Sequence, residues 1–188
     1  LDAQVRRMLA DPKANSLVTS FAMKWLNLTD LEQVAPDPAL FPEFKEQLRK
    51  DFVTEVEAFV GSIFSDDRSV VDLLTAEHTF LNDRLAQHYG IAGVTGGQFR
   101  LVPQVPAERR GLLGKAAILL RTSYGDRTSP VLRGAWVLDK LLGTPPTPPP
   151  PDTATDLSQK AGEQPTTVRA RLEQHREKAS CKMCHGVI

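Results

Sequence analysis

The chain has 188 residues, enough for one sizeable domain or two small ones, and its composition of 41% hydrophobic and 24% charged residues is that of an ordinary globular protein. Lys plus Arg number 23, as do Asp plus Glu, so the formal net charge is zero. A neutral chain lacks a broad positive field, which excludes nucleic acid as a partner. Apolar stretches such as residues 116–120 are too short to cross a bilayer, so we expect no direct membrane span.

Helical periodicity dominates the first third of the chain. Residues 15–28 are predicted to form a helix with one apolar stripe, made of Leu17, Phe21, Trp25 and Leu28, and a second row beside it, made of Val18, Ala22 and Leu26. Residues 43–65 give the clearest amphipathic helix, with apolar side chains at steps of three and four: Phe44, Leu48, Phe52, Val56, Phe59 and Ile63. Asp51, Glu55 and Glu57 are interpreted as its solvated charged face, not as paired catalytic carboxylates.

Shorter helices follow, each with a recognisable end signal. Ser69 can cap one short helix, and Asn82 can cap another that ends at Gly90, a residue suited to the left-handed cap. Residues 91–106 lack helical periodicity and are predicted to form a loop with a short extended piece. A helix is expected from about Ala107 to Arg121.

The last helix of the body is predicted to begin at Ser129-Pro130 and to stop at Gly143. Six of the seven residues from 145 to 151 are proline, which predicts a stiff polyproline II spacer. Another helix is expected at about residues 167–179. The sequence thus predicts an all-α fold: an irregular helical domain at 1–143, a Pro-rich linker at 144–165, and the start of a cytochrome c-like haem-binding segment at 166–188.

The strongest chemical signal is Cys181-Lys182-Met183-Cys184-His185, a Cys-x-x-Cys-His motif. Two thiols at this spacing can add to the two vinyl groups on one edge of a porphyrin, and the next imidazole can then bind the iron. The chain has only 2 Cys and 4 His, so this arrangement would arise by chance on the order of once in several thousand sequences. We therefore predict haem c, attached through Cys181 and Cys184 with His185 as an axial ligand.

Other uses of the two cysteines are weaker alternatives. A thioredoxin-like redox pair expects a βαβ context that the pattern lacks, and a zinc site would need a fourth ligand, although the chain has no second Cys pair. A plain disulfide or two inert thiols remain open.

The second axial iron ligand has several candidates. His175 shares a helical stripe with Val168 and Leu172, and it is the candidate that we favour within the chain, after a ligand from the segment expected beyond the motif. His88 is interpreted mainly as a helix-end or packing residue whose positive charge would suit the helix dipole, and His78 has less context. Met8 and Met23 lie on apolar stripes and are expected in the core, whereas Met183 lies on the same side of the iron as His185.

Arginines surround the turn at residues 122–126. Arg121, Arg127 and Arg133 carry guanidinium groups that suit carboxylates, such as the two propionates of a haem. A solvated or ion-paired loop is the interpretation we favour.

Several phrases resemble the large multi-domain cytochrome c proteins of planctomycete type, whose domains are of unknown function. They are Phe80 to Leu85, His88 to Gly90, Arg110 to Leu113, Thr128 to Gly134, Trp136 to Leu138, Leu142 to Pro146, and Leu172 to Arg176 leading into the Cys181 motif. The resemblance implies an extracytoplasmic, periplasmic-type location and c-type haem, with no common reaction. It also implies a further segment after the motif, so we expect a truncated piece of a longer protein whose missing part supplies the distal side.

Three functions follow as hypotheses. The leading one is electron transfer through the covalently bound haem, with a redox partner protein or other subunits of a larger complex. The second is a haem enzyme, peroxidase-like or oxidase-like, with an open sixth iron position. The third is a structural subunit of a redox assembly. A low-spin six-coordinate iron favours the first, and a high-spin five-coordinate iron favours the second.

Overall fold

The computed structural model describes residues 1–147 and 167–177. They are mostly helical, as expected, but the prediction of a purely α fold needs one correction. The described part also contains a two-stranded antiparallel sheet, in which β1 (Thr79–Leu81) pairs with β2 (Arg100–Val102). The chain divides into two compact units, Leu1–Arg133 and Gly134–Ile188.

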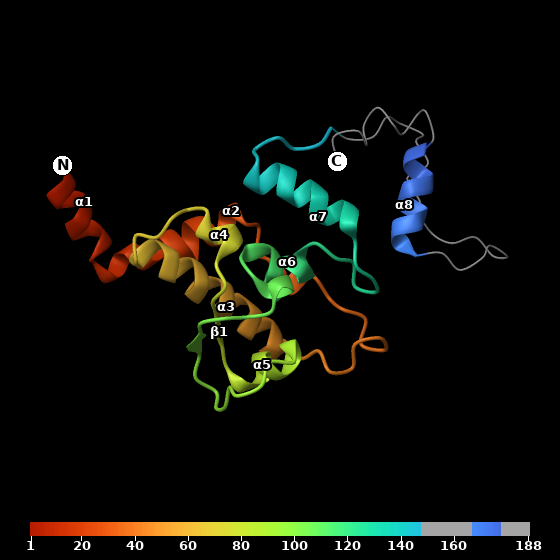
Figure 1. Ribbon diagram of the computed structural model, residues 1–188, viewed down its shortest axis with the longest axis horizontal. Helices are drawn as coiled ribbons and strands as arrows, with labels where there is room; N and C mark the ends of the chain where they lie inside the picture. Colours follow the sequence, from red (N-terminus) through yellow and green to blue (C-terminus); the bar gives the residue numbers. More distant parts are fainter. Residues whose placement is uncertain (148–166, 178–188) are drawn as a thin grey trace. The chain divides into compact units, whose positions relative to one another are not determined.

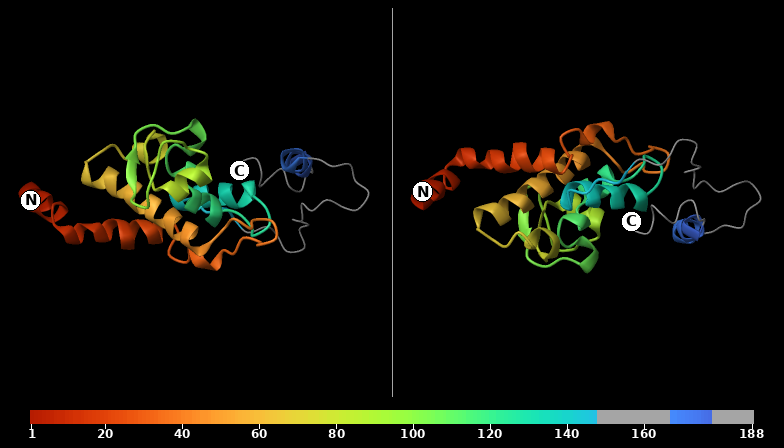
Figure 2. Two further views of the ribbon diagram at one scale, coloured as in Figure 1. Left: turned by 90° about the horizontal axis from the view of Figure 1, so that it is seen from below. Right: turned by 90° about the horizontal axis from the view of Figure 1, so that it is seen from above.

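The N-terminal segment is a series of short helices: α1 (Asp2–Leu9), η1 (Pro12–Asn15), η2 (Leu17–Ala22), α2 (Met23–Trp25) and η3 (Leu31–Gln33). No residue of α1 is buried, and both views in Figure 2 show this helix at the tip of the N-terminal segment. Met8 is 57% exposed, so its predicted place in the core is wrong, whereas Met23 is buried as expected.

The apolar stripe predicted for residues 15–28 is also corrected. Val18, Ala22 and Leu26 of the second row are buried, and so is Leu28 of the predicted stripe, while Phe21 is 59% exposed and Leu17 is exposed as well. Residues 17–22 form the π-helix η2, whose turns are wider than those of the α-helix that the periodicity assumes. The second row therefore contacts the core together with Leu28.

Helix α3 (Glu46–Ser65) is the centre of the first unit. Figure 1 shows it beside β1, α5 and α6, and it contacts each of them. The predicted apolar residues Leu48, Phe52, Val56, Phe59 and Ile63 are all buried. Asp51 and Glu55 are buried too, so the prediction that they form a solvated charged face is wrong. The neighbouring elements β1, α5, α6 and η2 pack on α3, and together they cover polar positions as well as the apolar stripe.

Short elements then pack on α3: α4 (Asp72–Thr75), β1 and α5 (Asp83–Tyr89). The predicted caps of α5 are confirmed, because the Asn82 side chain accepts from the Leu85 amide at 2.9 Å and Gly90 has a φ of 70°. In the sheet, Phe80 lies opposite Leu101. Strands of three residues carry too little alternation for a sequence pattern to detect them.

The helix predicted over residues 107–121 is broken into three pieces: η4 (Ala107–Arg109), η5 (Leu112–Gly114) and α6 (Ala116–Arg121). The break occurs at Gly111, whose φ of 53° and ψ of −169° are incompatible with a helix. A Cβ at this position would overlap the backbone of Leu74, so the close approach of α4 requires glycine.

Helix α7 (Pro130–Trp136) continues into the π-helix η6 (Val137–Leu141). The Ser129 hydroxyl accepts from the Leu132 amide at 3.2 Å, and Gly143 has a φ of 65°, so both predicted ends are confirmed. The predicted final helix is α8 (Val168–Glu177). Most of the predicted linker at 144–165 and of the segment at 166–188 lies outside the described residues, and these boundaries stay predictions. No helix in the described part is long and apolar enough to cross a membrane.

Candidate functional site

The predicted haem-attachment residues Cys181, Cys184 and His185 lie outside the described residues, so their role stays a prediction. His175 lies within α8, whose first turn is capped by the Thr167 hydroxyl accepting from the Ala170 amide at 3.1 Å. Within the ranges that the structure describes, no group of three or more His, Cys, Asp or Glu side chains could hold a metal ion.

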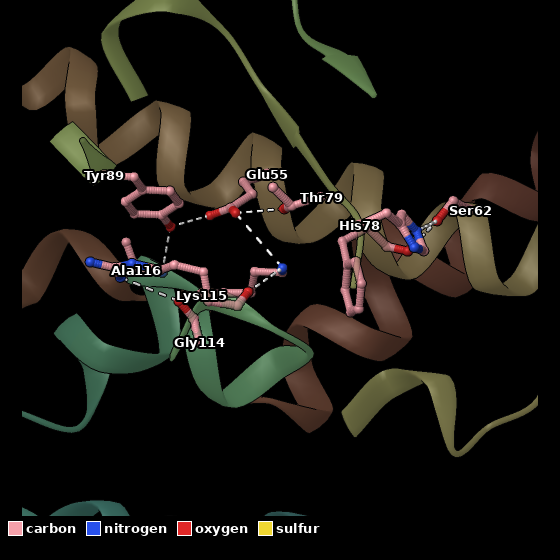
Figure 3. A network of polar contacts seen from close by, with 10 residues as sticks. Glu55, Ser62, His78, Thr79, Tyr89, Gly114, Lys115 and Ala116 are labelled. Carbon is pink, nitrogen blue, oxygen red and sulfur yellow. Dashed lines mark hydrogen bonds and ion pairs between the residues drawn. The ribbon is translucent and has the colours of Figure 1, made fainter. Parts of the chain in front are cut away.

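A buried polar network is built around Glu55 (Figure 3). This side chain projects from α3, and each of its carboxylate oxygens accepts a hydrogen bond. The Thr79 hydroxyl, from β1, donates to Oε1 at 2.7 Å, and the Tyr89 hydroxyl, from α5, donates to Oε2 at 2.5 Å. The Tyr89 oxygen in turn accepts from the Ala116 amide at 2.9 Å. One carboxylate thus joins α3, β1, α5 and the start of α6.

Lys115 supplies the positive charge of the network. Its Nζ lies 4.0 Å from Glu55 Oε1, donates to the Arg109 carbonyl at 3.2 Å, and lies 4.3 Å from the centre of the Phe59 ring. Both charged side chains are fully buried. A buried charge is tolerated only when it is paired and hydrogen-bonded, and these contacts meet that requirement.

Burial shifts the pKa of each member toward its neutral form. It raises the pKa of Glu55, although Lys115, Thr79 and Tyr89 oppose the shift, and it lowers the pKa of Lys115 to about 8 against the attraction of Glu55. Burial also raises the pKa of Tyr89 well above its usual value. Glu55, Tyr89 and Lys115 connect α3 with β1, α5 and the start of α6, so the network holds these elements together.

A second polar group lies around His78, which precedes β1 (Figure 3). Its Nε2 lies 3.0 Å from the Ser62 hydroxyl and its Nδ1 lies 3.4 Å from an Arg68 nitrogen. Because a guanidinium can only donate, Nδ1 must accept and the ring proton must be on Nε2. Ser62 then accepts from His78 and donates to the Phe59 carbonyl at 2.8 Å. This direction is opposite to that of a Ser–His catalytic pair, in which the histidine accepts the serine proton.

A pocket of about 460 Å³ lies beside the N-terminal half of α3 in the first unit. Its polar side chains include His88 and Arg109, and much of its wall is apolar or aromatic. Burial against that wall, together with the Arg109 cation, lowers the pKa of His88. The positive charge expected of His88 at the helix end is therefore corrected to a neutral ring, which packs on Phe52 at a centroid distance of 5.2 Å.

The arginine loop is ion-paired, as favoured from sequence. Arg127 pairs with Asp126 at 2.8 Å, and Arg133 donates to the Thr128 hydroxyl at 3.2 Å. Arg121 lies against Asn27, whose side-chain oxygen accepts from it at 2.6 Å when the amide is suitably oriented.

Sequence reasoning missed the network and the pocket. A charged residue within an amphipathic helix is normally solvated, but Glu55 lies three residues after Phe52 and four before Phe59, on the apolar stripe itself, and this spacing separates it from the half-buried Glu57. One usable signal was Lys115 beside the apolar run 116–120, since a lysine next to a buried segment needs an anion. Which anion it meets depends on long-range contacts.

Comparisons with known proteins divide the chain in two. Residues 1–91 match the family model PSD4, a protein of unknown function (DUF1592), and residues 109–188 match PSCyt3, also a protein of unknown function (DUF1588). No curated protein and no solved structure matches the chain. The chain therefore joins two segments, each similar to an uncharacterised family that is found in planctomycete-type multihaem cytochrome c proteins.

Proposed function

We propose that this chain belongs to an extracytoplasmic c-type cytochrome that transfers electrons through a covalently bound haem. The observation that carries the proposal is the Cys181-x-x-Cys184-His185 motif, and the similarity of residues 109–188, which include it, to PSCyt3 supports a cytochrome c-like protein. The donor set fits the group: two thiols can form thioethers and one imidazole can bind iron. When bound, haem c supplies a one-electron ferrous–ferric couple.

The protein's own residues have distinct tasks in this proposal. Cys181 and Cys184 fasten the cofactor, and His185 binds the iron from one side. His175, within α8, is the candidate for the other axial position inside the chain. Attachment of this kind takes place outside the bacterial cytoplasm, so the proposal includes a periplasmic-type location and a redox partner protein or neighbouring subunits.

The first experiment tests attachment. The chain is expressed in a periplasm that carries the haem-attachment machinery, and the product is extracted with acidic acetone. We expect the haem to stay with the denatured chain, and Cys181→Ala and Cys184→Ala to remove one thioether each and shift the pyridine haemochrome band to longer wavelength. The matched control is His78→Gln, which changes a histidine in the first unit. Extractable haem, or no haem, would overturn the proposal.

The second experiment tests electron transfer against catalysis. We expect the ferric protein to be low-spin and six-coordinate, and unaffected by low concentrations of added cyanide. A His175→Ala variant with a changed spectrum and potential would assign the second ligand to His175. The same spectrum in that variant would show that His175 only packs. A high-spin, five-coordinate iron in a protein that also carries the segment expected after the motif would contradict electron transfer and favour the haem enzyme.

A further inference from the structure

The pocket beside α3 has a defined frame. One wall is the loop at residues 36–44 and another is the turn at 123–128, and the Asp37 amide joins them by donating to the Gly125 carbonyl at 2.8 Å. A Cβ at Gly125 would overlap the Ala35 carbonyl, so the two segments lie in direct contact. The floor comes from α3 and α5. Arg109 of η4 and three residues of α6 complete the lining, and together these segments of the first unit surround about 460 Å³, a volume typical of small-molecule sites.

The wall of this pocket is a continuous run of rings. Phe44 and Phe52 lie with their centroids 6.1 Å apart, and Phe52 and His88 are 5.2 Å apart. Phe41 and Tyr124 also line the pocket and are 46% and 48% exposed. Exposed rings next to a hollow are surface that a flat apolar molecule could cover.

The run of rings ends at Arg109, a cation that makes no direct ion pair in the described part of the chain. The Arg109 guanidinium lies 4.1 Å from the centre of the Tyr89 ring, and its NH1 donates to the Gly114 carbonyl at 3.4 Å. None of the ion pairs among the described residues involves Arg109. The other cation of the lining, Arg127, pairs with Asp126.

We propose that this pocket binds a small amphipathic monocarboxylate, with a flat apolar body against Phe44, Phe52 and His88 and a carboxylate paired with Arg109. A guanidinium fork suits a carboxylate, and the pair would be stronger in a partly buried pocket than on an open surface. The lining also contains Glu43, which repels more highly charged anions such as phosphate dianions. This site is independent of haem attachment, because every residue in it belongs to the first unit.

The test measures heat of binding on the full chain with 2-naphthoate and with its uncharged amide, 2-naphthamide. We expect saturable one-to-one binding of 2-naphthoate. The amide should bind at least about tenfold more weakly, because only the acid can pair with the guanidinium. Equal affinity for the acid and the amide would overturn the proposed role of Arg109. No binding of 2-naphthoate would overturn the site.

Variants locate the binding. Arg109→Gln is expected to weaken 2-naphthoate about tenfold and to leave 2-naphthamide unchanged, while Arg109→Lys recovers part of the loss. The matched control is Arg100→Gln, an exposed arginine of β2 away from the pocket. Phe41→Ser, which removes an exposed ring, should weaken both molecules and keeps the test valid if Arg109→Gln does not fold. Unchanged binding in both Arg109→Gln and Phe41→Ser would overturn the proposal.

Discussion

The Glu55 network and the Arg109 pocket use the same kinds of side chain in opposite ways. In the network, both carboxylate oxygens accept hydrogen bonds and the Lys115 ammonium contacts an anion, a carbonyl and a ring. In the pocket, the Arg109 guanidinium contacts a ring and one carbonyl and makes no direct ion pair among the described residues. Tyr89 belongs to both regions, with its hydroxyl in the network and its ring under Arg109.

The difference separates structural charges from charges available to a ligand. A buried charge without its partner costs several kcal/mol, so compensated charges such as Glu55 and Lys115 are tied to the stability of the fold. A half-buried guanidinium that still contacts water is tolerated without a direct ion pair, and it can bind an anionic ligand. Stability measurements should therefore respond strongly to changes in the network and weakly to changes at the pocket.

The largest effect is expected for Lys115→Met. This change removes the cation and leaves the Glu55 carboxylate buried without an ion-pair partner, which should lower the free energy of unfolding by about 3–5 kcal/mol. Urea unfolding followed by circular dichroism measures the loss. The control is Lys50→Met, an exposed lysine on the same α3, which should change stability by less than about 0.5 kcal/mol. Equal effects of the two variants would show that the buried pair is not structural.

Gly111→Ala should come next, with a loss of about 2–3 kcal/mol. The added methyl would overlap the Leu74 backbone and would stand at a φ of 53°, so η5 and Lys115 would have to shift. Gly97→Ala is the matched control, because a Cβ there meets no atom within 4 Å. A Gly111→Ala variant as stable as Gly97→Ala would contradict the close approach of α4.

Tyr89→Phe separates the two halves of the comparison, since it removes the hydroxyl and keeps the ring under Arg109. Two hydrogen bonds are lost, and the Ala116 amide is left without its acceptor, so stability should fall by about 1–2 kcal/mol. Binding of 2-naphthoate should persist. Tyr124→Phe, at an exposed ring, is expected to change stability little. A larger loss of stability in Tyr124→Phe than in Tyr89→Phe would contradict the structural role of the Tyr89 hydroxyl.

The pH dependence of stability reports Lys115. Because burial lowers its folded pKa from 10.5 to about 8, the unfolded chain holds a proton between pH 8 and 10.5 that the folded chain has released. The contribution of Lys115 to the free energy of unfolding should therefore rise with pH across this window, by at most about 1.4 kcal/mol per pH unit. Subtracting the pH dependence measured for the Lys115→Met variant removes the contribution of the other titratable groups. A difference that falls with pH would contradict the shift.

The smallest effect on the free energy of unfolding is expected from the titration of His88 in the pocket. The His88 ring should titrate with a midpoint below 6.5 in proton NMR, because the aromatic wall and Arg109 disfavour its charged form. Since the unfolded chain takes up this proton first, His88 lowers stability slightly as the pH falls through that range. Phe52→Leu and Arg109→Gln should each raise the midpoint. A midpoint above 6.5 in the wild type would show that the ring faces water or an anion.

Local signals predicted much of the secondary structure. The stripe of α3, the Asn82 and Ser129 caps and the glycine ends at Gly90 and Gly143 are all observed, because each depends on residues within one or two turns. The errors occur where distant segments meet. Gly111 breaks a predicted helix because α4 lies against it, and Leu17 and Phe21 of the predicted stripe in residues 15–28 are exposed.

The sequence by itself determined the Cys181 motif, the neutral charge and the helical class, since covalent spacing, composition and periodicity are properties of the chain alone. Only the tertiary structure decided which charges are compensated. Glu55 and Lys115 are 60 positions apart, and Glu55 and Tyr89 are 34 apart, so nothing local links them. Packing of α3 against β1, α5 and α6 removes water from Glu55, Lys115 and Tyr89, so that the Glu55 carboxylate becomes part of the structure. Arg109 lies at the pocket beside α3 and remains available to an anion.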